Sequence, residues 1–63
     1  MDNIKIIIVE VADVYKKPSF KSEITTQALL WEKLIIIDKK KSWFKVKQWD
    51  DYIGWVHEFN LID

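Results

Sequence analysis

The side chains best suited to catalysis in this chain are a lone histidine, three serines and two adjacent aspartates. These candidates are His57, Ser19, Ser22, Ser42 and the pair Asp50-Asp51. Acyl transfer requires a nucleophile, a base that orients it and an oxyanion hole. The serines lie in polar segments without a nucleophile-elbow motif, and adjacent aspartates between two strand-like runs are typical turn formers. We therefore predict no catalytic residue and no enzymatic activity, with His57 as a partly exposed residue at a strand end.

The chain also has few of the residue types that bind metals, cofactors or nucleic acids. The chain has no cysteine and one histidine, whereas a zinc site needs three or four closely spaced ligands. The formal net charge is zero, and all ten basic residues are lysines. Without arginine, the chain lacks the side chain that binds phosphate and guanine in bidentate fashion. We predict no metal, no cofactor and no nucleic-acid partner.

The densest charge cluster consists of lysines in and after a polar turn. They are Lys39, Lys40, Lys41, Lys45 and Lys47. One interpretation is a solvated turn and strand face that suppresses edge pairing. The other is weak attraction for an anionic polymer.

Aromatic residues give the clearest sign of a binding surface. Rings that line a shallow groove hold a peptide or a sugar by stacking and apolar contact. The candidate ligand-binding residues are Tyr15, Trp43, Trp55 and Phe59. Some rings of so small a domain must instead cover the ends of its core, and we predict this for Trp31 and Trp49. Trp43 is open to both roles from the sequence alone.

Residues 42–56 position most of these rings, and they predict a β-hairpin. Two runs rich in aromatic and β-branched residues flank Asp50-Asp51. Side chains alternate along a strand, so Phe44 faces the core while Trp43 faces away from it. Ile53 and Val56 differ in parity, and Gly54 lies between them. A glycine inside a strand marks a bulge or a close backbone approach, so we predict a kinked second strand.

The remaining segments predict short strands joined by turns. Residues 4–11 read as one strand with an excess of apolar side chains, so we expect part of the pair Ile6/Ile8 or of Ile7/Val9 to be exposed. Residues 12–26, broken by Pro18, read as a long irregular loop. The later expected elements are a short strand or turn approach at 27–31, a strand at 33–38 with Leu34 and Ile36 inward, a polar turn at 38–42, a helical turn at 57–60 and a last strand at 61–62.

The length of 63 residues makes one domain, residues 1–63, with a small core. A chain of this size buries only about 60% of the surface that its unfolded form exposes. Its longest apolar runs are far too short to span a bilayer, and no signal peptide is visible at Met1. Several short strands, a long early loop and no convincing helix predict an all-β fold, a small barrel of five to six antiparallel strands.

The order of several motifs resembles the bacterial SH3-like (SH3b) domain over about residues 9–62. The motifs are Val14-Tyr15-Lys16-Lys17-Pro18-Ser19, Ser22-Glu23, Gln27-Ala28-Leu29-Leu30-Trp31-Glu32, Trp43-Phe44-Lys45-Val46 and Tyr52-Ile53-Gly54-Trp55-Val56. The version that the chain resembles most accompanies NlpC-type peptidases of the bacterial cell wall. Trp31, Tyr15 and Asp51 depart from the family pattern, which often has glycine, arginine and glycine at those positions.

The resemblance implies a non-catalytic targeting or substrate-gating module of a cell-wall hydrolase. Its partner would be peptidoglycan peptide or an adjacent peptidase domain, and its location the cell envelope or the exterior. Trp43 matches the groove tryptophan of SH3-like folds. Two alternatives remain open at this point: an adaptor for proline-rich peptides in the polyproline II conformation, and a purely structural packing domain.

Overall fold

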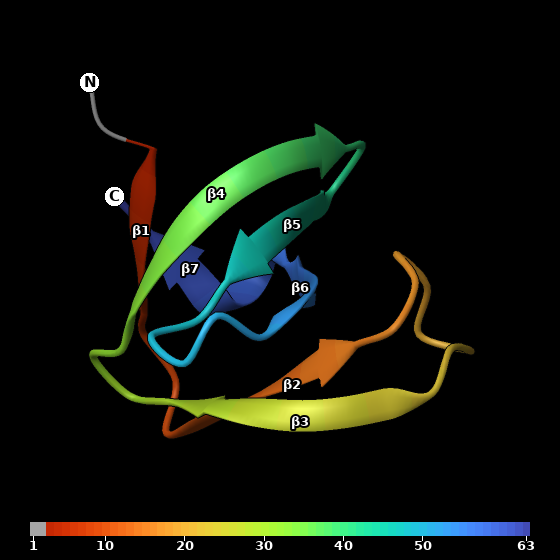
Figure 1. Ribbon diagram of the computed structural model, residues 1–63, viewed down its shortest axis with the longest axis horizontal. Coiled ribbons are helices and arrows are strands. Elements are labelled where there is room, and N and C mark those ends of the chain that lie inside the picture. The colour runs from red at the N-terminus through yellow and green to blue at the C-terminus, as the bar shows by residue number, and fades with distance from the viewer. Residues whose placement is uncertain (1–2) are drawn as a thin grey trace.

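The structure, a computed structural model, describes residues 3–63, and this part of the chain forms seven short strands and one 3-10 turn (Figure 1). The strands are β1 (Ile4–Ile7), β2 (Val11–Tyr15), β3 (Ile24–Leu29), β4 (Lys33–Lys40), β5 (Trp43–Lys47), β6 (Ile53–His57) and β7 (Leu61–Ile62), and the 3-10 turn is η1 (Glu58–Asn60). They pair in the order β3-β2-β6-β5-β4-β1-β7, and every pairing is antiparallel. The all-β SH3-like fold is confirmed, with seven strands in place of five or six.

The core lies inside this curled sheet, and each strand contributes to it. Because side chains alternate along a strand, each strand turns one row inward. The buried core residues are Ile7, Ala12, Val14, Ala28, Leu34, Val46, Val56 and Leu61. Phe44 is half-buried and packs against them, as predicted. The inward residues are aliphatic, so the large aromatic rings lie outside this core or at its edge.

The predicted single strand over residues 4–11 is wrong, because the chain bends at residues 8–10. β1 pairs with β4 and β7, whereas β2 pairs with β3 and β6. The bend therefore carries the chain from one half of the sheet to the other. Its backbone groups are used there: the Ile8 N–H donates to the Asn60 carbonyl, and the Glu10 carbonyl accepts from the Leu30 N–H. A run of apolar residues carries no signal for such long-range partners.

The long loop predicted over residues 12–26 is also shorter in the structure. β2 and β3 form a hairpin, and only residues 16–23 connect them. The inward side chains Ala12 and Ala28 are small, and the outward ones include the exposed apolar Val11 and Leu29, so the alternation that marks a strand is weak in the sequence. The uncertain segment at 27–31 is the end of β3 and the turn that follows it.

Most of the later elements agree with the sequence. β4 contains the predicted strand, with Leu34 buried and Ile36 half-buried. The polar turn predicted at 38–42 is wrong over residues 38–40, because β4 continues through Lys40 and the chain turns only at Lys41 and Ser42. The helical turn is η1, and β7 is the edge strand beside β1.

Gly54 marks a close backbone approach and not a kink. β5 and β6 pair in unbroken register from Trp43↔His57 to Lys47↔Ile53. Ile53 simply points outward and is exposed, while Val56 points inward, so their difference in parity needs no bulge. A Cβ at Gly54 would overlap Val14 Cγ1 and lie 3.1 Å from the Tyr15 carbonyl oxygen. Glycine is therefore the residue that lets β6 lie against β2.

Two tryptophans predicted to cover the ends of the core are exposed instead. Trp31 is 68% exposed in the β3–β4 turn, where it has a φ of 71°, and Trp49 is 81% exposed in the β5–β6 turn. Gln48 lies inward in place of Trp49: it is buried, and its Nε2 donates to Glu32 Oε2 at 3.0 Å and to the Gln27 carbonyl at 3.3 Å. The amide thus joins the two turns, and the neighbouring indole points away from the core.

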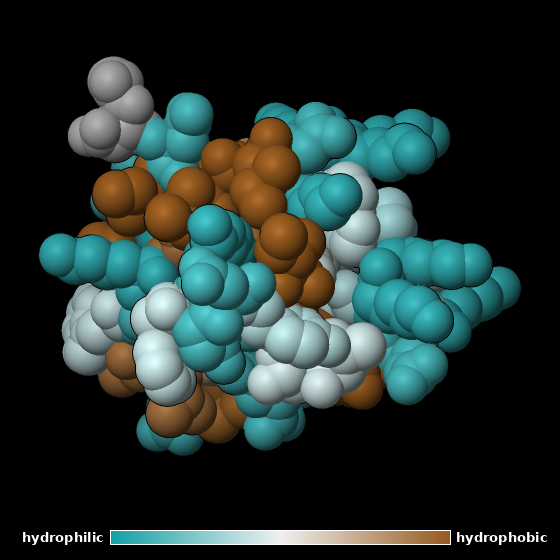
Figure 2. All heavy atoms as spheres, in the orientation of Figure 1, coloured by the Kyte–Doolittle hydropathy of each residue, from teal (hydrophilic) through white to brown (hydrophobic). Residues whose placement is uncertain are grey.

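The apolar excess of the first segment is exposed in part, as predicted. Ile8 is exposed and Ile6 half-buried, whereas Ile7 is fully buried. Hydrophobic side chains gather over β1 and β4 in Figure 2. We call the exposed isoleucines of β1, β4 and the adjoining β7 the isoleucine face: Ile4, Ile35, Ile37 and Ile62. Within residues 3–63, no helix is long and apolar enough to cross a membrane.

Replacement of Gly54 by alanine tests the close approach of β6 to β2. Because the new methyl group overlaps Val14, we expect Gly54→Ala to lower the free energy of unfolding by about 1–3 kcal/mol, measured by denaturant titration. Adding Val14→Ala should reduce the further cost of the Gly54 substitution, since the overlapping methyl is then gone. An unchanged midpoint for Gly54→Ala would contradict this account of the glycine.

Replacement of Ile35 tests the isoleucine face. An exposed apolar area of this kind favours association with another apolar surface, so we expect the chain to self-associate at high concentration. Ile35→Lys should suppress the association seen by sedimentation velocity. Ile24→Lys, at an exposed isoleucine on the opposite edge strand β3, is the matched control and should not. A wild-type chain that stays monomeric at millimolar concentration would contradict the prediction.

Candidate functional site: an aromatic cluster beside a lysine-lined cleft

The β5–β6 hairpin places its aromatic residues on the outer face of the sheet. Trp43 begins β5 and pairs with His57 at the end of β6, and Lys45 pairs with Trp55. Phe44 and Val46, at the alternate positions, turn toward the core. Trp43 is not part of that core, which agrees with its predicted direction.

The end of β2 adds Tyr15 to the same face. Tyr15 pairs with Trp55 across the β2–β6 junction, so its side chain lies on the outer face as well. Its ring meets the Trp43 indole edge to face, with ring centres 5.3 Å apart and an interplanar angle of 83°. Such an arrangement brings the positive edge of one ring to the negative face of the other and is worth about 0.5–1.5 kcal/mol.

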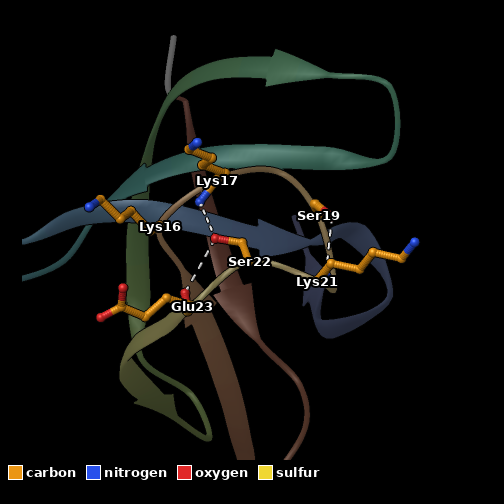
Figure 3. Close-up of a pocket in the computed structure, with 6 residues that line it drawn as sticks. All are labelled: Lys16, Lys17, Ser19, Lys21, Ser22 and Glu23. Atoms are coloured by element: carbon orange, nitrogen blue, oxygen red, sulfur yellow. Dashed lines mark hydrogen bonds between the residues drawn. The ribbon is translucent and has the colours of Figure 1, made fainter.

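The loop at residues 16–23 brings in Phe20, which the sequence did not indicate as a site residue. The Lys16 N–H donates to the Glu23 carbonyl at 2.9 Å, which closes the base of the loop. The Lys17 N–H donates to Ser22 Oγ at 2.9 Å, and the Lys21 N–H to Ser19 Oγ at 3.1 Å (Figure 3). These serines are turn formers rather than nucleophiles.

Phe20 lies over the outer rings as a result of this loop conformation. Its ring centre is 4.7 Å from that of Trp43, 5.0 Å from that of His57 and 5.8 Å from that of Tyr15. Trp43 is only 8% exposed under this cover, while Phe20 itself is 65% exposed. A single aromatic residue in an otherwise polar loop was the one signal that could have identified it.

η1 completes the cluster with Phe59. The His57 Nδ1 accepts a hydrogen bond from the Phe59 N–H at 3.3 Å, which caps η1. The two rings lie 4.7 Å apart, and Phe59 is 79% exposed. We call Tyr15, Phe20, Trp43, His57 and Phe59 the aromatic cluster.

Three of the four predicted site residues therefore share one cluster. Tyr15, Trp43 and Phe59 belong to it, while Trp55 lies beside Tyr15 in the sheet and is half-buried. His57, expected only as a strand-end residue, is half-buried at the end of β6 and contacts Phe20, Trp43 and Phe59. Whether these residues bind a ligand stays a prediction.

Two hollows lie beside the aromatic cluster. A cleft of about 430 Å³ separates the loop from the β4–β5 turn and is lined by Pro18, Lys40, Lys41, Ser42, Trp43 and His57. A second hollow, of about 410 Å³, lies within the loop itself and is lined by Lys16, Lys17, Ser19, Lys21, Ser22 and Glu23 (Figure 3). The first has aromatic walls and the second has none.

The site has the composition of a binding surface. The imidazole of His57 has its Nδ1 engaged by the backbone of η1. Among residues 3–63, no three His, Cys, Asp or Glu side chains come close enough together to hold a metal ion. Flat rings around a cleft with lysine at its rim can hold a ligand by apolar contact and charge.

The curled antiparallel sheet, its loop at residues 16–23 and the outward aromatic rings define a small SH3-like domain. In agreement with this class, residues 14–61 match the family described as the bacterial dipeptidyl-peptidase SH3 domain. The match covers most of the chain, and the chain belongs to this family. A comparison with curated protein sequences finds no match.

Removal of the Phe20 ring tests whether it covers Trp43. In a background with the exposed Trp31 and Trp49 replaced by phenylalanine, Phe20→Ala should raise acrylamide quenching of the remaining indole emission. The fold should persist with a loss of about 0.5–1.5 kcal/mol, the worth of an aromatic pair such as Phe20–Trp43, since Phe20 itself is mostly exposed. Phe59→Ala is the matched control, because Phe59 contacts His57 and its removal should change quenching less. Equal quenching with and without Phe20 would contradict the geometry.

Proposed function

We propose that this domain is a non-catalytic binding module of a bacterial cell-wall hydrolase that recognises peptidoglycan peptide through the aromatic cluster. It would target the enzyme or help to shape the entrance of an adjacent peptidase site. The observation that supports the proposal most directly is the arrangement of two exposed rings, Phe20 and Phe59, around the covered indole of Trp43. Tyr15 and Trp55 extend this surface along the sheet.

The rings suit a short, extended ligand. Exposed aromatic side chains offer large apolar area at a low entropic cost, because each has only two side-chain torsions. The surface is shallow, so binding must be weak, with a dissociation constant on the order of 0.1–1 mM. Weak binding is sufficient for a domain that acts beside a second, covalently joined one, since the effective concentration is then high.

The family description supports the context of the proposal, because it names a bacterial peptidase. An adjacent peptidase domain is accordingly the expected protein partner, and the cell envelope or the exterior the expected location. Both remain part of the proposal.

The alternative of an adaptor for proline-rich peptides has less support. Such peptides need an aromatic groove, which is present here, and they frequently carry basic residues. The β2–β3 hairpin and its loop bear the carboxylates Asp13 and Glu23 against Lys16, Lys17 and Lys21. A second alternative, a packing domain without a ligand, is favoured by the isoleucine face.

A titration with a cell-wall stem peptide, followed by NMR on the 15N-labelled domain, tests the proposal. We expect shifts at Phe20, Trp43 and Phe59, and we expect Phe20→Ala and Phe59→Ala each to weaken binding about fivefold or more. Trp49→Ala is the matched control: this ring is equally exposed but lies in the turn at the other end of the β5–β6 hairpin, so affinity should not change.

A proline-rich peptide of equal length should cause little change in the same spectra. Binding of that peptide alone would support the adaptor in place of the wall-peptide module. Binding of neither peptide would favour the packing domain.

A further inference from the structure

The cleft beside the aromatic cluster is lined on one side by neighbouring lysines. Lys40 pairs with Trp43 across β4 and β5, so its side chain lies on the same outer face as the indole. Lys41 follows in the turn with a φ of 57°, a left-handed conformation that costs free energy for a residue with a side chain. Both lysines line the cleft, and Pro18 lies on the opposite wall.

Hydrogen-bond donors dominate the polar part of this lining. Besides the two ammonium groups, the lining contains the hydroxyl of Ser42 and the imidazole of His57, which add further donors. Because His57 Nδ1 accepts the Phe59 N–H, the ring proton of the neutral imidazole is on Nε2. No carboxylate is among the lining residues.

The neighbouring carboxylates do not neutralise the lysines. The carboxylate of Asp38 is engaged by the backbone, because its Oδ1 accepts the Lys39 N–H at 2.8 Å. Within residues 3–63, the two ion pairs are Lys5–Asp63 and Lys47–Asp51. Neither Lys40 nor Lys41 has an ion-pair partner in this part of the chain.

We propose that this cleft selects a peptide with a free carboxylate, which Lys40 and Lys41 bind while the peptide backbone lies on the aromatic cluster. The inference rests on the proposed function and names the charge of its ligand. The covered indole forms an apolar wall, and a carboxylate placed against it is partly removed from water. Its attraction to two ammonium groups is then stronger than at an open surface, and hydrogen bonds between charged groups strengthen it further.

The hollow within the loop does not have this property, although three lysines line it. In Figure 3 the side chains of Lys16, Lys17 and Lys21 point away from one another, and Glu23 belongs to the same lining. Ser19 and Ser22 accept hydrogen bonds from the loop backbone. The loop lysines therefore provide a matched control with the same change in charge.

The test compares a stem peptide that has a free glutamate α-carboxylate with the same peptide amidated at that group. Wild-type domain should bind the free acid about five to ten times more tightly, and the ratio should shrink as the ionic strength is raised. The Lys40→Gln/Lys41→Gln variant should bind both peptides with the weaker affinity. The Lys16→Gln/Lys17→Gln variant should keep the wild-type preference. Circular dichroism confirms that each variant is folded.

The outcomes separate this inference from the proposed function. Equal binding of both peptides by the wild type overturns the carboxylate site but leaves the proposed function standing. Loss of preference in the loop variant, with retention in the turn variant, also overturns it. Binding of neither peptide overturns both proposals. Lysine-dependent binding of poly(glycerol phosphate), without binding of the acidic peptide, would show that the lysines serve an anionic polymer instead.

Discussion

The close approach of β6 to β2 at Gly54 is the contact on which the site depends. Glycine is needed at position 54 of β6, because a Cβ there would overlap the Val14 side chain and approach the Tyr15 carbonyl. Tyr15 is the last residue of β2 and the one that pairs with β6, at Trp55. The same junction joins the β2–β3 hairpin to the rest of the sheet, and the loop at residues 16–23 starts directly after it. A shift of β2 by even one methyl radius would move Tyr15 and Phe20 away from Trp43.

The aromatic cluster acts as a second packed layer outside the barrel. The fully buried interior holds aliphatic side chains, one or two from each strand, and the ring of Phe44 packs at its edge. The rings on the outer face instead cover one another edge to face, each pair worth about 0.5–1.5 kcal/mol. For a small domain, with a total stability of only about 5 kcal/mol or somewhat more, such pairs matter. Their outermost members stay open to solvent and free to contact a ligand.

The sequence predicted the parts of the fold that local pattern determines. The β5–β6 hairpin, the inward direction of Leu34 and the helical turn before β7 all follow from alternation and turn residues. It did not predict the bend between β1 and β2, because the backbone partners at Asn60 and Leu30 are distant in sequence. The strands at residues 11–15 and 24–29 were hidden by small inward alanines.

Some residues of the aromatic cluster could be predicted from the sequence and others could not. Trp43 lies in the cluster because of its strand parity, which the sequence shows, and Phe59 because of the helical turn. Tyr15 joins them as the last residue of β2, within a segment that the sequence predicted as a loop. Phe20 joins them through loop hydrogen bonds that involve Ser19 and Ser22, whose geometry is not encoded in a simple period.

The two ends of the β5–β6 hairpin show how one buried polar residue decides where aromatic rings go. At the far end, the Gln48 amide turns inward to reach Glu32 and the Gln27 carbonyl, so the next residue, Trp49, must point outward. The two hydrogen bonds satisfy the Nε2 of this buried amide and avoid the cost of about 1–3 kcal/mol for an unpaired polar group, while its Oε1 has no hydrogen-bond partner within residues 3–63. At the near end no inward polar group competes, and the rings gather around Trp43. Among residues 3–63, the aromatic cluster therefore lies at the end of the hairpin without a buried polar side chain, and not at the end that carries Trp49.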